Sequence, residues 1–336
     1  MAGAWKQMAR KLVLPALYRL RVFDLLVRCS RRPFAIVMYH GVHPGTAEFP
    51  INSRHLPAKD FEEHLRFFRR NFELIPLSRL AELLGSGRPL RGRKLVLTFD
   101  DGYRNNLLAA ALARNHRAPL TVFVGTGVVR HPGTSHHADE LDFMLLTTGE
   151  TVLEYAGQRW PLGDTRSRRA AGRGVGALLK QENSAGKERR LRELAERLRP
   201  DPARRRPLED FLAYLTEEDL RTLGHNQFVE VGSHSVEHHN LDQLSAEERE
   251  RELQESRAYL EEVLGRPVTT FSYPDGSYDA ETRAAAARHY ACACAVNPRL
   301  DRTGRDLYEL PRLGFSADDT VPIQIFYLVR YLLRRS

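Results

Sequence analysis

The chain has few cysteines and no long uninterrupted run of apolar residues. Only three of its 336 residues are cysteines, Cys29, Cys292 and Cys294. Three thiols offer no disulfide framework, so the fold does not require an oxidising compartment. Charged residues such as Arg19 and Asp24 interrupt the apolar residues near the start of the chain. A signal peptide needs an apolar stretch of about 7 to 15 residues and a membrane span about 20. The sequence therefore predicts a cytoplasmic protein or one bound peripherally to a membrane.

The sequence also has no basic, aromatic-interleaved module of the kind that binds nucleic acid. Its net charge of +8 and isoelectric point near 9.5 suit an anionic membrane or nucleic acid, and the missing module argues against nucleic acid. Arginine is dense in residues 1–32 and 319–336, where apolar spacing predicts amphipathic basic helices. Such helices either attach to an anionic membrane or pack on the protein. No repeat divides the remainder, so we expect one large domain at residues 33–318.

The most informative stretch is residues 95–103, which read Leu-Val-Leu-Thr-Phe-Asp-Asp-Gly-Tyr. A short apolar run ends in two carboxylates, Asp100 and Asp101, and a glycine, which is typical of a buried strand that turns into a loop. A helical stretch and a second apolar run at residues 120–124 follow, so this part predicts a strand–helix–strand unit. Parallel sheets built from such units have their sites at the carboxyl ends of the strands. A simple Asp-Gly turn also fits these residues.

A second polar cluster follows the apolar run at residues 228–231. His234 and His238 stand four residues apart, and in a helical turn both imidazoles would point to one side and bind one metal ion. A carboxylate from another strand end would complete a three-ligand set with open positions for water and substrate. In isolation, the same residues are also compatible with a polar surface, because the chain has 13 histidines.

Taken together, these motifs resemble a known family. Thr-Phe-Asp-Asp-Gly at 98–102, His-Ser-x-x-His at 234–238 and Phe-Ser-Tyr-Pro-Asp-Gly at 271–276 are similar in order and spacing to the NodB-like polysaccharide deacetylases, carbohydrate esterase family four. Met-Tyr-His-Gly-Val at 38–42 resembles the branch that includes the poly-N-acetylglucosamine deacetylases. The resemblance implies an α/β fold, a distorted (β/α)7 TIM-like barrel of the NodB type, with a helical insertion and amphipathic terminal helices.

The resemblance also implies a chemistry, the hydrolysis of a linear amide in an N-acetylated amino sugar. Asp101, His234 and His238 would bind Zn²⁺, or another divalent ion such as Co²⁺, Ni²⁺ or Mn²⁺, and Asp100 would be the general base. His40 would donate a proton to the departing amine, or make a structural hydrogen bond at the barrel mouth. The substrate would be an N-acetylated glycan. The alternatives are a lipid-linked sugar or a small amide as the substrate, or a non-catalytic relative that binds glycans. The sequence does not indicate the oligomeric state.

The same resemblance implies the remaining site residues. Tyr103, Tyr273, Pro274 and Asp275 are expected around the substrate, with a backbone N–H near Asp275 facing the oxyanion. Related sequences often have an aromatic residue at the position of Asp275, so an aromatic contribution to the groove wall is not expected there. Arg312 is expected either as the partner of an aspartate or as a surface arginine.

The polar, arginine-rich stretch at residues 126–206 predicts an insertion between barrel strands, with a lid or a substrate-facing surface. His131, His136 and His137 lie in it and would be solvated or reach the metal. A Thr-Glu-Glu-Asp capping box at residues 216–219 predicts the start of the helix that returns the chain to the barrel.

Overall fold

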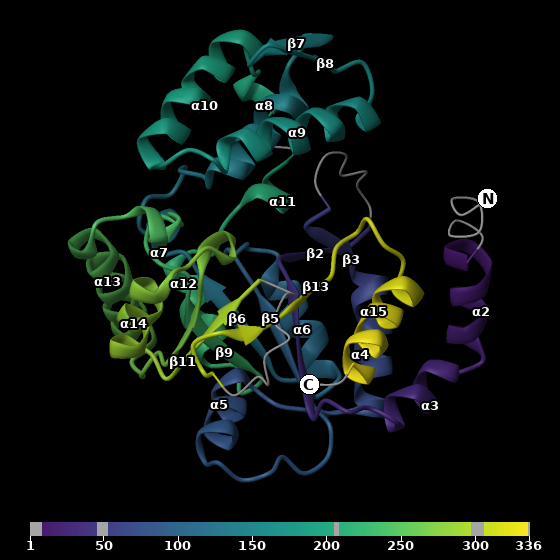
Figure 1. The fold of residues 1–336 in the computed structure, drawn as a ribbon. Coiled ribbons are helices and arrows are strands. Elements are labelled where there is room, and N and C mark those ends of the chain that lie inside the picture. The colour runs from purple at the N-terminus through teal and green to yellow at the C-terminus, as the bar shows by residue number, and fades with distance from the viewer. Residues whose placement is uncertain (1–8, 46–52, 205–207, 297–305, 335–336) are drawn as a thin grey trace.

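The structure is a computed structural model that describes residues 9–45, 53–204, 208–296 and 306–334. Its centre is a sheet in which every pair of neighbouring strands is parallel (Figure 1). In chain order, the strands are β1 (Phe34–Tyr39), β5 (Lys94–Phe99), β6 (Leu120–Val124), β9 (Val229–Ser233), β10 (Thr270–Ser272), β11 (Cys292–Ala295), β12 (Leu310–Pro311) and β13 (Leu313–Gly314). Their side chains are almost all buried, as expected for parallel strands covered on both faces.

The last two short strands bring the edges of this sheet together. β12 pairs with β11 and β13 pairs with β1, while Arg312 lies between them in the chain. Residues 310–314 therefore act as one interrupted strand that nearly closes a barrel. The predicted distorted (β/α)7 barrel is confirmed. A two-residue strand, β4 (Glu73–Leu74), also pairs with β5, and β2 (Gly41–His43) pairs with β3 (His55–Pro57) outside the barrel.

Amphipathic helices cover the outside of the barrel. They are α4 (Ala58–Asn71), α5 (Leu77–Gly85), α6 (Asn106–Asn115), α12 (Glu217–Gly224), α13 (Ala246–Leu264) and α14 (Ala280–His289). α4 buries Phe61, Leu65 and Phe68, the residues whose spacing predicts a core-facing side. Helix α12 begins at the predicted capping box, in which the Thr216 side chain accepts from the backbone N–H of Asp219 at 3.1 Å.

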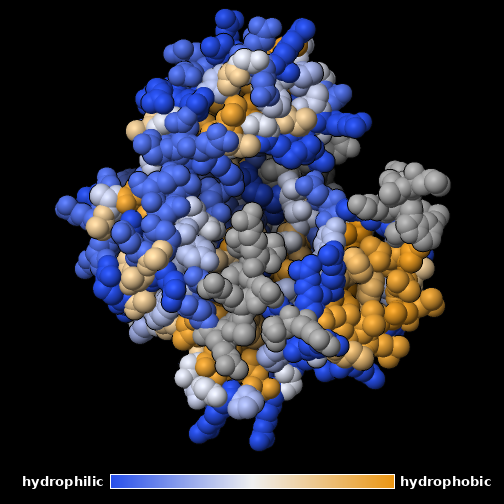
Figure 2. Space-filling model, in the orientation of Figure 1, coloured by the Kyte–Doolittle hydropathy of each residue, from blue (hydrophilic) through white to orange (hydrophobic). Residues whose placement is uncertain are grey.

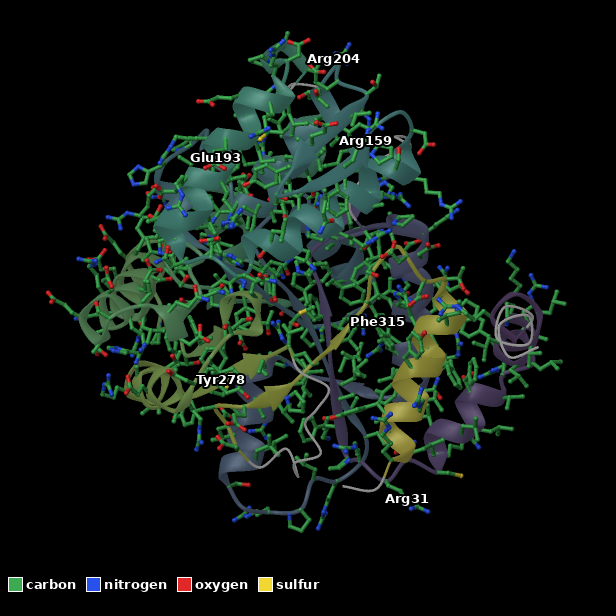
Figure 3. The ribbon with its side chains drawn as sticks, turned by 45° about the horizontal axis from the view of Figure 1, so that its top comes forward. Arg31, Arg159, Glu193, Arg204, Tyr278 and Phe315 are labelled. Carbon is green, nitrogen blue, oxygen red and sulfur yellow. The ribbon has the colours of Figure 1, made fainter. Side chains whose placement is uncertain are left out.

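Residues 137–198 form a separate cap above the barrel (Figure 1). The cap consists of α8 (His137–Thr147), the hairpin of β7 (Val152–Tyr155) and β8 (Gln158–Pro161), α9 (Thr165–Leu179) and α10 (Ser184–Leu198). It has its own apolar core, with Leu145, Leu162, Val175 and Leu194 fully buried. In Figure 3, Arg159 and Glu193 lie on the outer surface of the cap and Arg204 lies in the segment that follows it, whereas Phe315 is buried in the barrel.

The short helices α7 (Thr126–Arg130) and α11 (Glu209–Leu212), with a 3-10 turn at Pro202–Arg204, connect the barrel to the cap. Two further 3-10 turns, at Leu241–Gln243 and Pro274–Gly276, follow barrel strands β9 and β10.

The terminal segments pack against each other on one side of the barrel. A π-helical turn at Ala9–Val13 leads into α2 (Leu14–Arg19) and α3 (Val22–Arg28), and Arg21 in the left-handed region separates these two helices. Phe23 and Val27 of α3 are buried, and α3 contacts α15 (Val321–Leu333) near the C-terminus. No helix among the described residues has both the length and the apolar character needed to cross a membrane.

One buried histidine of the core makes stability depend on pH. The His64 ring lies 3.1 Å from the Tyr39 hydroxyl, and burial lowers the pKa of His64 to about 3. The unfolded chain binds a proton near pH 6.5, so the folded state loses stability as pH falls from 6.5 towards 3, by up to about 1.4 kcal/mol per pH unit. We expect His64→Gln to flatten this slope in urea unfolding measured between pH 7 and 4.

The exposed His225 supplies the control, because its ring is not enclosed by the core. His225→Gln should leave the pH dependence of unfolding unchanged. An identical slope in the wild type and in His64→Gln would contradict the assignment to His64.

Candidate metal centre and active site

Asp100 and Asp101 follow strand β5 at its carboxyl end. Adjacent side chains on a strand point to opposite faces, but Asp101 has a φ of 72° and Gly102 a φ of 69°, so the backbone leaves the strand geometry here. A Cβ on Gly102 would lie 3.1 Å from the side chain of Val124. Both the positive φ and this close contact favour glycine at position 102. Both carboxylates line one cavity of about 540 Å³ between the barrel and the cap.

His234 and His238 lie in the loop after β9, and the structure corrects the predicted reason for their approach. Residues 234–238 form no helical turn. Instead, Ser235 and His238 have φ values of 66° and 56°, and the backbone N–H of His238 donates to Ser235 Oγ at 3.1 Å. The loop brings the two imidazole centroids to within 4.8 Å of each other.

The two histidines converge on Asp101. Asp101 Oδ1 lies 3.5 Å from Nε2 of His234 and 3.4 Å from Nε2 of His238, and one ligand atom from each residue lies within 4.8 Å of the others. Burial alone would raise the pKa of Asp101, but hydrogen bonds to the two imidazoles outweigh burial and place this pKa well below its usual value. This is the only such group of three among the described residues.

The donor set fits a divalent metal ion. His234 Nδ1 donates to the carbonyl oxygen of Ser272 at 2.8 Å, so Nε2, on the side of Asp101, is the nitrogen that would bind an ion. Two imidazoles and one carboxylate are a common ligand set of zinc sites that keep open positions for water and substrate.

Asp100 is held by a buried arginine rather than by the histidines. Arg312 is 2% exposed, and its Nη1 and Nη2 donate to the two carboxylate oxygens of Asp100 at 2.6 and 2.7 Å. Burial raises the pKa of Asp100, but the charge and hydrogen bonds of Arg312 oppose it and leave the pKa below its usual value. Arg312 Nη2 also donates to Ser272 Oγ at 2.7 Å. Arg312 is therefore the partner of an aspartate and not a surface arginine.

The four other expected histidines differ in position. His40 and His136 line the cavity with the two aspartates, while His131 is exposed at the surface. Burial lowers the pKa of His40, and the nearby Asp101 and Asp100 partly counteract this effect. Nε2 of His136 is buried and has no hydrogen-bond partner among the described residues, and its ring centroid lies 4.7 Å from that of His238. His137 also lines the cavity.

The residues expected around the substrate are only partly available to it. Tyr103 and Tyr273 are fully buried and do not line the cavity. The Tyr103 hydroxyl donates to Asp139 at 2.8 Å, and the Tyr273 hydroxyl donates to a main-chain carbonyl at 3.0 Å. Both hydroxyls are therefore used within the fold, and contact of these two tyrosines with substrate stays a prediction.

Of the Pro274 and Asp275 pair, Pro274 is buried and Asp275 lines the cavity. Asp275 has a φ of 53°, and its carboxylate accepts from Lys180 Nζ of the cap at 2.6 Å. The sequence predicted a lid or substrate-facing surface in this insertion but did not identify Lys180 or the other cap residues that line the cavity, because no local motif marks the side of α9 and α10 that faces the barrel.

With this geometry in place, comparison with known proteins defines the class. Residues 199–291 match the family model for polysaccharide deacetylases. The Bacillus subtilis (strain 168) protein named "Putative polysaccharide deacetylase YxkH" is 19% identical over 284 residues, which cover 84% of this chain and 71% of that protein. Residues 199–291 are thus similar to a polysaccharide deacetylase domain, and the predicted resemblance to this family is confirmed. The branch indicated by the Met-Tyr-His motif stays a prediction.

Solved structures support the same fold. The Streptococcus pyogenes deacetylase PplD, solved in complex with acetate, superposes with a TM-score of 0.57 at 16% identity and covers 90% of this chain and 98% of its own. IcaB from Ammonifex degensii has a TM-score of 0.57 at 15% identity and covers 91% and 99% of the two chains. At these identities, the likeness establishes a shared fold.

The metal centre can be tested without any substrate. We expect the purified protein to take up about one divalent ion per chain, and the double variant Asp101→Ala, His238→Ala to lose at least 100-fold in affinity, because two of three ligands are gone. Metal content after dialysis and titration with Zn²⁺ measure this. The exposed His225→Ala is the matched control. Equal zinc uptake by the double variant would place the metal elsewhere.

Proposed function

We propose that this protein is a metal-dependent hydrolase that removes N-acetyl groups from the amino sugars of a glycan. The proposal depends above all on one observation. Asp101, His234 and His238 converge at the floor of a cavity, and a second carboxylate, Asp100, lies beside them and is held by Arg312. A deacetylase of this kind needs one group of residues to bind the metal and a separate carboxylate to move a proton.

Asp101, His234 and His238 would hold the ion, with Zn²⁺ the best match and Co²⁺, Ni²⁺ or Mn²⁺ as alternatives. When bound, such an ion polarises the amide carbonyl and lowers the pKa of water. The chain's own contribution is to fix the ligands. The Ser272 carbonyl orients His234, and the bond from the His238 backbone to Ser235 Oγ fixes the loop.

Asp100 would accept a proton from the attacking water. Arg312 keeps this carboxylate ionised and oriented, and an ionised carboxylate retains acceptor capacity beyond the two bonds from the guanidinium. A backbone N–H near Asp275 would donate to the oxyanion that develops during attack, because the 3-10 turn at Pro274–Gly276 borders the cavity through Asp275.

His40 would donate a proton to the departing amine. Its side chain lines the cavity together with Asp100 and Asp101, and these two carboxylates favour the protonated imidazole. Burial lowers the pKa of His40, and this effect is larger than the opposing effect of each carboxylate. A purely structural role is the alternative, and the His40 carbonyl already accepts from Asn106 Nδ2 at 2.7 Å.

The decisive experiment compares Asp100→Asn with the wild type. We expect this variant to bind about one metal ion per chain but to release acetate from N-acetylglucosamine oligomers about 10²- to 10⁴-fold more slowly, because an amide cannot accept the proton. Metal analysis and acetate release are measured on the same samples.

Loss of metal from Asp100→Asn would contradict the division between base and ligand. If the wild type binds metal but releases no acetate from any N-acetylated glycan or sugar, the protein is a non-catalytic glycan-binding relative instead.

A lipid-linked sugar is the second candidate substrate, and the surface of the terminal helices favours it. The exposed large hydrophobic residues of the described chain all lie there: Leu12, Val13, Leu20 and Leu25, with 41 to 74% of each residue exposed. Figure 2 shows the apolar area on this side of the molecule. Scattered single residues of this kind are unremarkable, but a grouped set marks an interaction surface.

The charge around this surface points to an anionic bilayer as the occupant. Lys11, Arg19 and Arg28 are exposed in the same helices and make no ion pair with any described residue. The acidic residue of the segment, Asp24, is buried and already paired with Arg70 and Arg21. Apolar side chains flanked by unpaired basic residues are typical of interfacial membrane binding.

Vesicle binding tests this surface. We expect the protein to sediment with vesicles of phosphatidylglycerol and phosphatidylcholine, and more weakly with phosphatidylcholine alone. Leu20→Ser combined with Leu25→Ser should reduce the partition constant at least tenfold, since each buried leucine contributes about 1.5 to 3 kcal/mol. Arg192→Gln on the cap is the control. Equal binding by the leucine variant would argue that this face meets another partner.

A further inference from the structure

The roof of the active-site cavity is formed by one face of helix α9 and the start of helix α10. The residues of α9 on this face recur every three or four positions, so they lie along one side of the helix. Most of them are basic or small, namely Arg169, Gly172, Arg173, Gly176 and Ala177; Leu179 also lines the cavity, and Lys180 directly follows the helix. Lys187, in the first turn of α10, lines the same cavity.

Most acidic groups of the cavity are already committed. Asp100 pairs with Arg312, Asp275 with Lys180, and Asp142 with Arg54 at 2.5 Å. Asp101 belongs to the candidate metal centre. Two cations of the cap, Arg173 and Lys187, line the cavity and make no ion pair with a described residue. They are therefore the groups that could bind an anionic part of a ligand.

Lys187 is the more unusual of these cations. It is only 4% exposed, and its ammonium contacts the Asn240 amide oxygen at 3.3 Å but no carboxylate within 4.0 Å among the described residues. Burying an ammonium without a counter-charge is unfavourable. Burial lowers the pKa of Lys187 and outweighs the opposing charges of Asp275 and Asp242, while the nearby Lys180 adds to the lowering.

Arg173 supplies a second cation to the same cavity. Its side chain is exposed, and it makes no ion pair with any described residue. Gly172 and Gly176 flank it on the cavity side of α9, so no long side chain next to it blocks the approach of a ligand. A guanidinium and an ammonium that face one cavity suit phosphate, whose several oxygens accept hydrogen bonds from separate donors.

We propose that the cavity binds an acylated amino sugar that carries a phosphate group, with Lys187 and Arg173 as the cationic contacts of the phosphate. This inference rests on the proposed function, because the amide must lie at the metal centre while the phosphate faces the cap. A volume of about 540 Å³ is within the range of sites for small ligands.

Binding calorimetry on the metal-loaded protein tests the proposal with three soluble probes: N-acetylglucosamine 1-phosphate, the neutral methyl glycoside of N-acetylglucosamine, and the carboxylate-bearing N-acetylmuramic acid. We expect the phosphate to bind at least tenfold more tightly than either other sugar. Lys187→Met should abolish this preference, Lys187→Arg should retain it, and Arg173→Gln should reduce it. Arg166→Gln, an exposed position of α9 outside the cavity, should leave it unchanged.

An equal affinity for the phosphate and neutral sugars, an equal affinity for the carboxylate, or a full preference in both Lys187→Met and Arg173→Gln would overturn the proposal. Arg173→Gln keeps the test valid if Lys187→Met does not fold, because Arg173 is exposed.

A fourth probe, the same sugar phosphate on a short polyprenyl chain, separates the two sources of phosphate. Tighter binding of this probe assigns a lipid-linked substrate, and equal binding assigns a soluble one.

Acetate release on the same samples separates this proposal from the proposed function. A phosphate preference that depends on Lys187, without acetate release from any probe or glycan, would leave the anion site standing and remove the deacetylase assignment. Acetate release from neutral oligomers, with kcat/KM for all sugars unchanged in Lys187→Met, would support the deacetylase assignment and remove the phosphate site.

Discussion

The buried pair of Asp100 and Arg312 is the interaction on which the site depends. One guanidinium joins the end of β5, through Asp100, to the end of β10, through Ser272 Oγ, and lies between the two halves of the closing strand. The carbonyl of the same Ser272 orients His234. Removing one partner of a buried ion pair typically destabilises a protein by about 3 to 5 kcal/mol, because the remaining charge stays unpaired. The closure of the barrel and the orientation of the proposed base Asp100 and the proposed metal ligand His234 are thus coupled through the Arg312 side chain.

The cap changes the electrostatics of a site whose floor is otherwise acidic and imidazole-rich. It has a hydrophobic core of its own and faces the cavity with basic and small residues of α9 and α10. The ion pair of Lys180 with Asp275 ties the cap to the loop after β10. Work on substrate choice should therefore concentrate on the cap, whereas work on the chemical step should concentrate on the barrel.

Local signals in the sequence predicted a parallel strand with an acidic carboxyl end, whereas the barrel was implied by the resemblance to a known family. An apolar run followed by Asp100, Asp101 and a glycine specifies a buried strand and its turn. The pairing of His234 with His238 was also predicted, but through the wrong geometry, since positive φ values in a loop replace the helical turn.

Other features depend on contacts that no local pattern contains. Tyr103 is buried because Asp139, 36 residues away, accepts from its hydroxyl, and Lys187 faces the cavity because the cap folds over the barrel. Arg312 could be placed only by its contact with Asp100, 212 residues earlier in the chain.

The separation of Arg312 from Asp100 in the chain has a consequence for biosynthesis. A ribosome delivers the β5 carboxylate long before the arginine that neutralises it, so the nascent barrel holds an uncompensated acidic strand end until its last strand emerges. Contacts so distant in sequence form slowly, and the active site is therefore assembled at the end of folding, with chain closure.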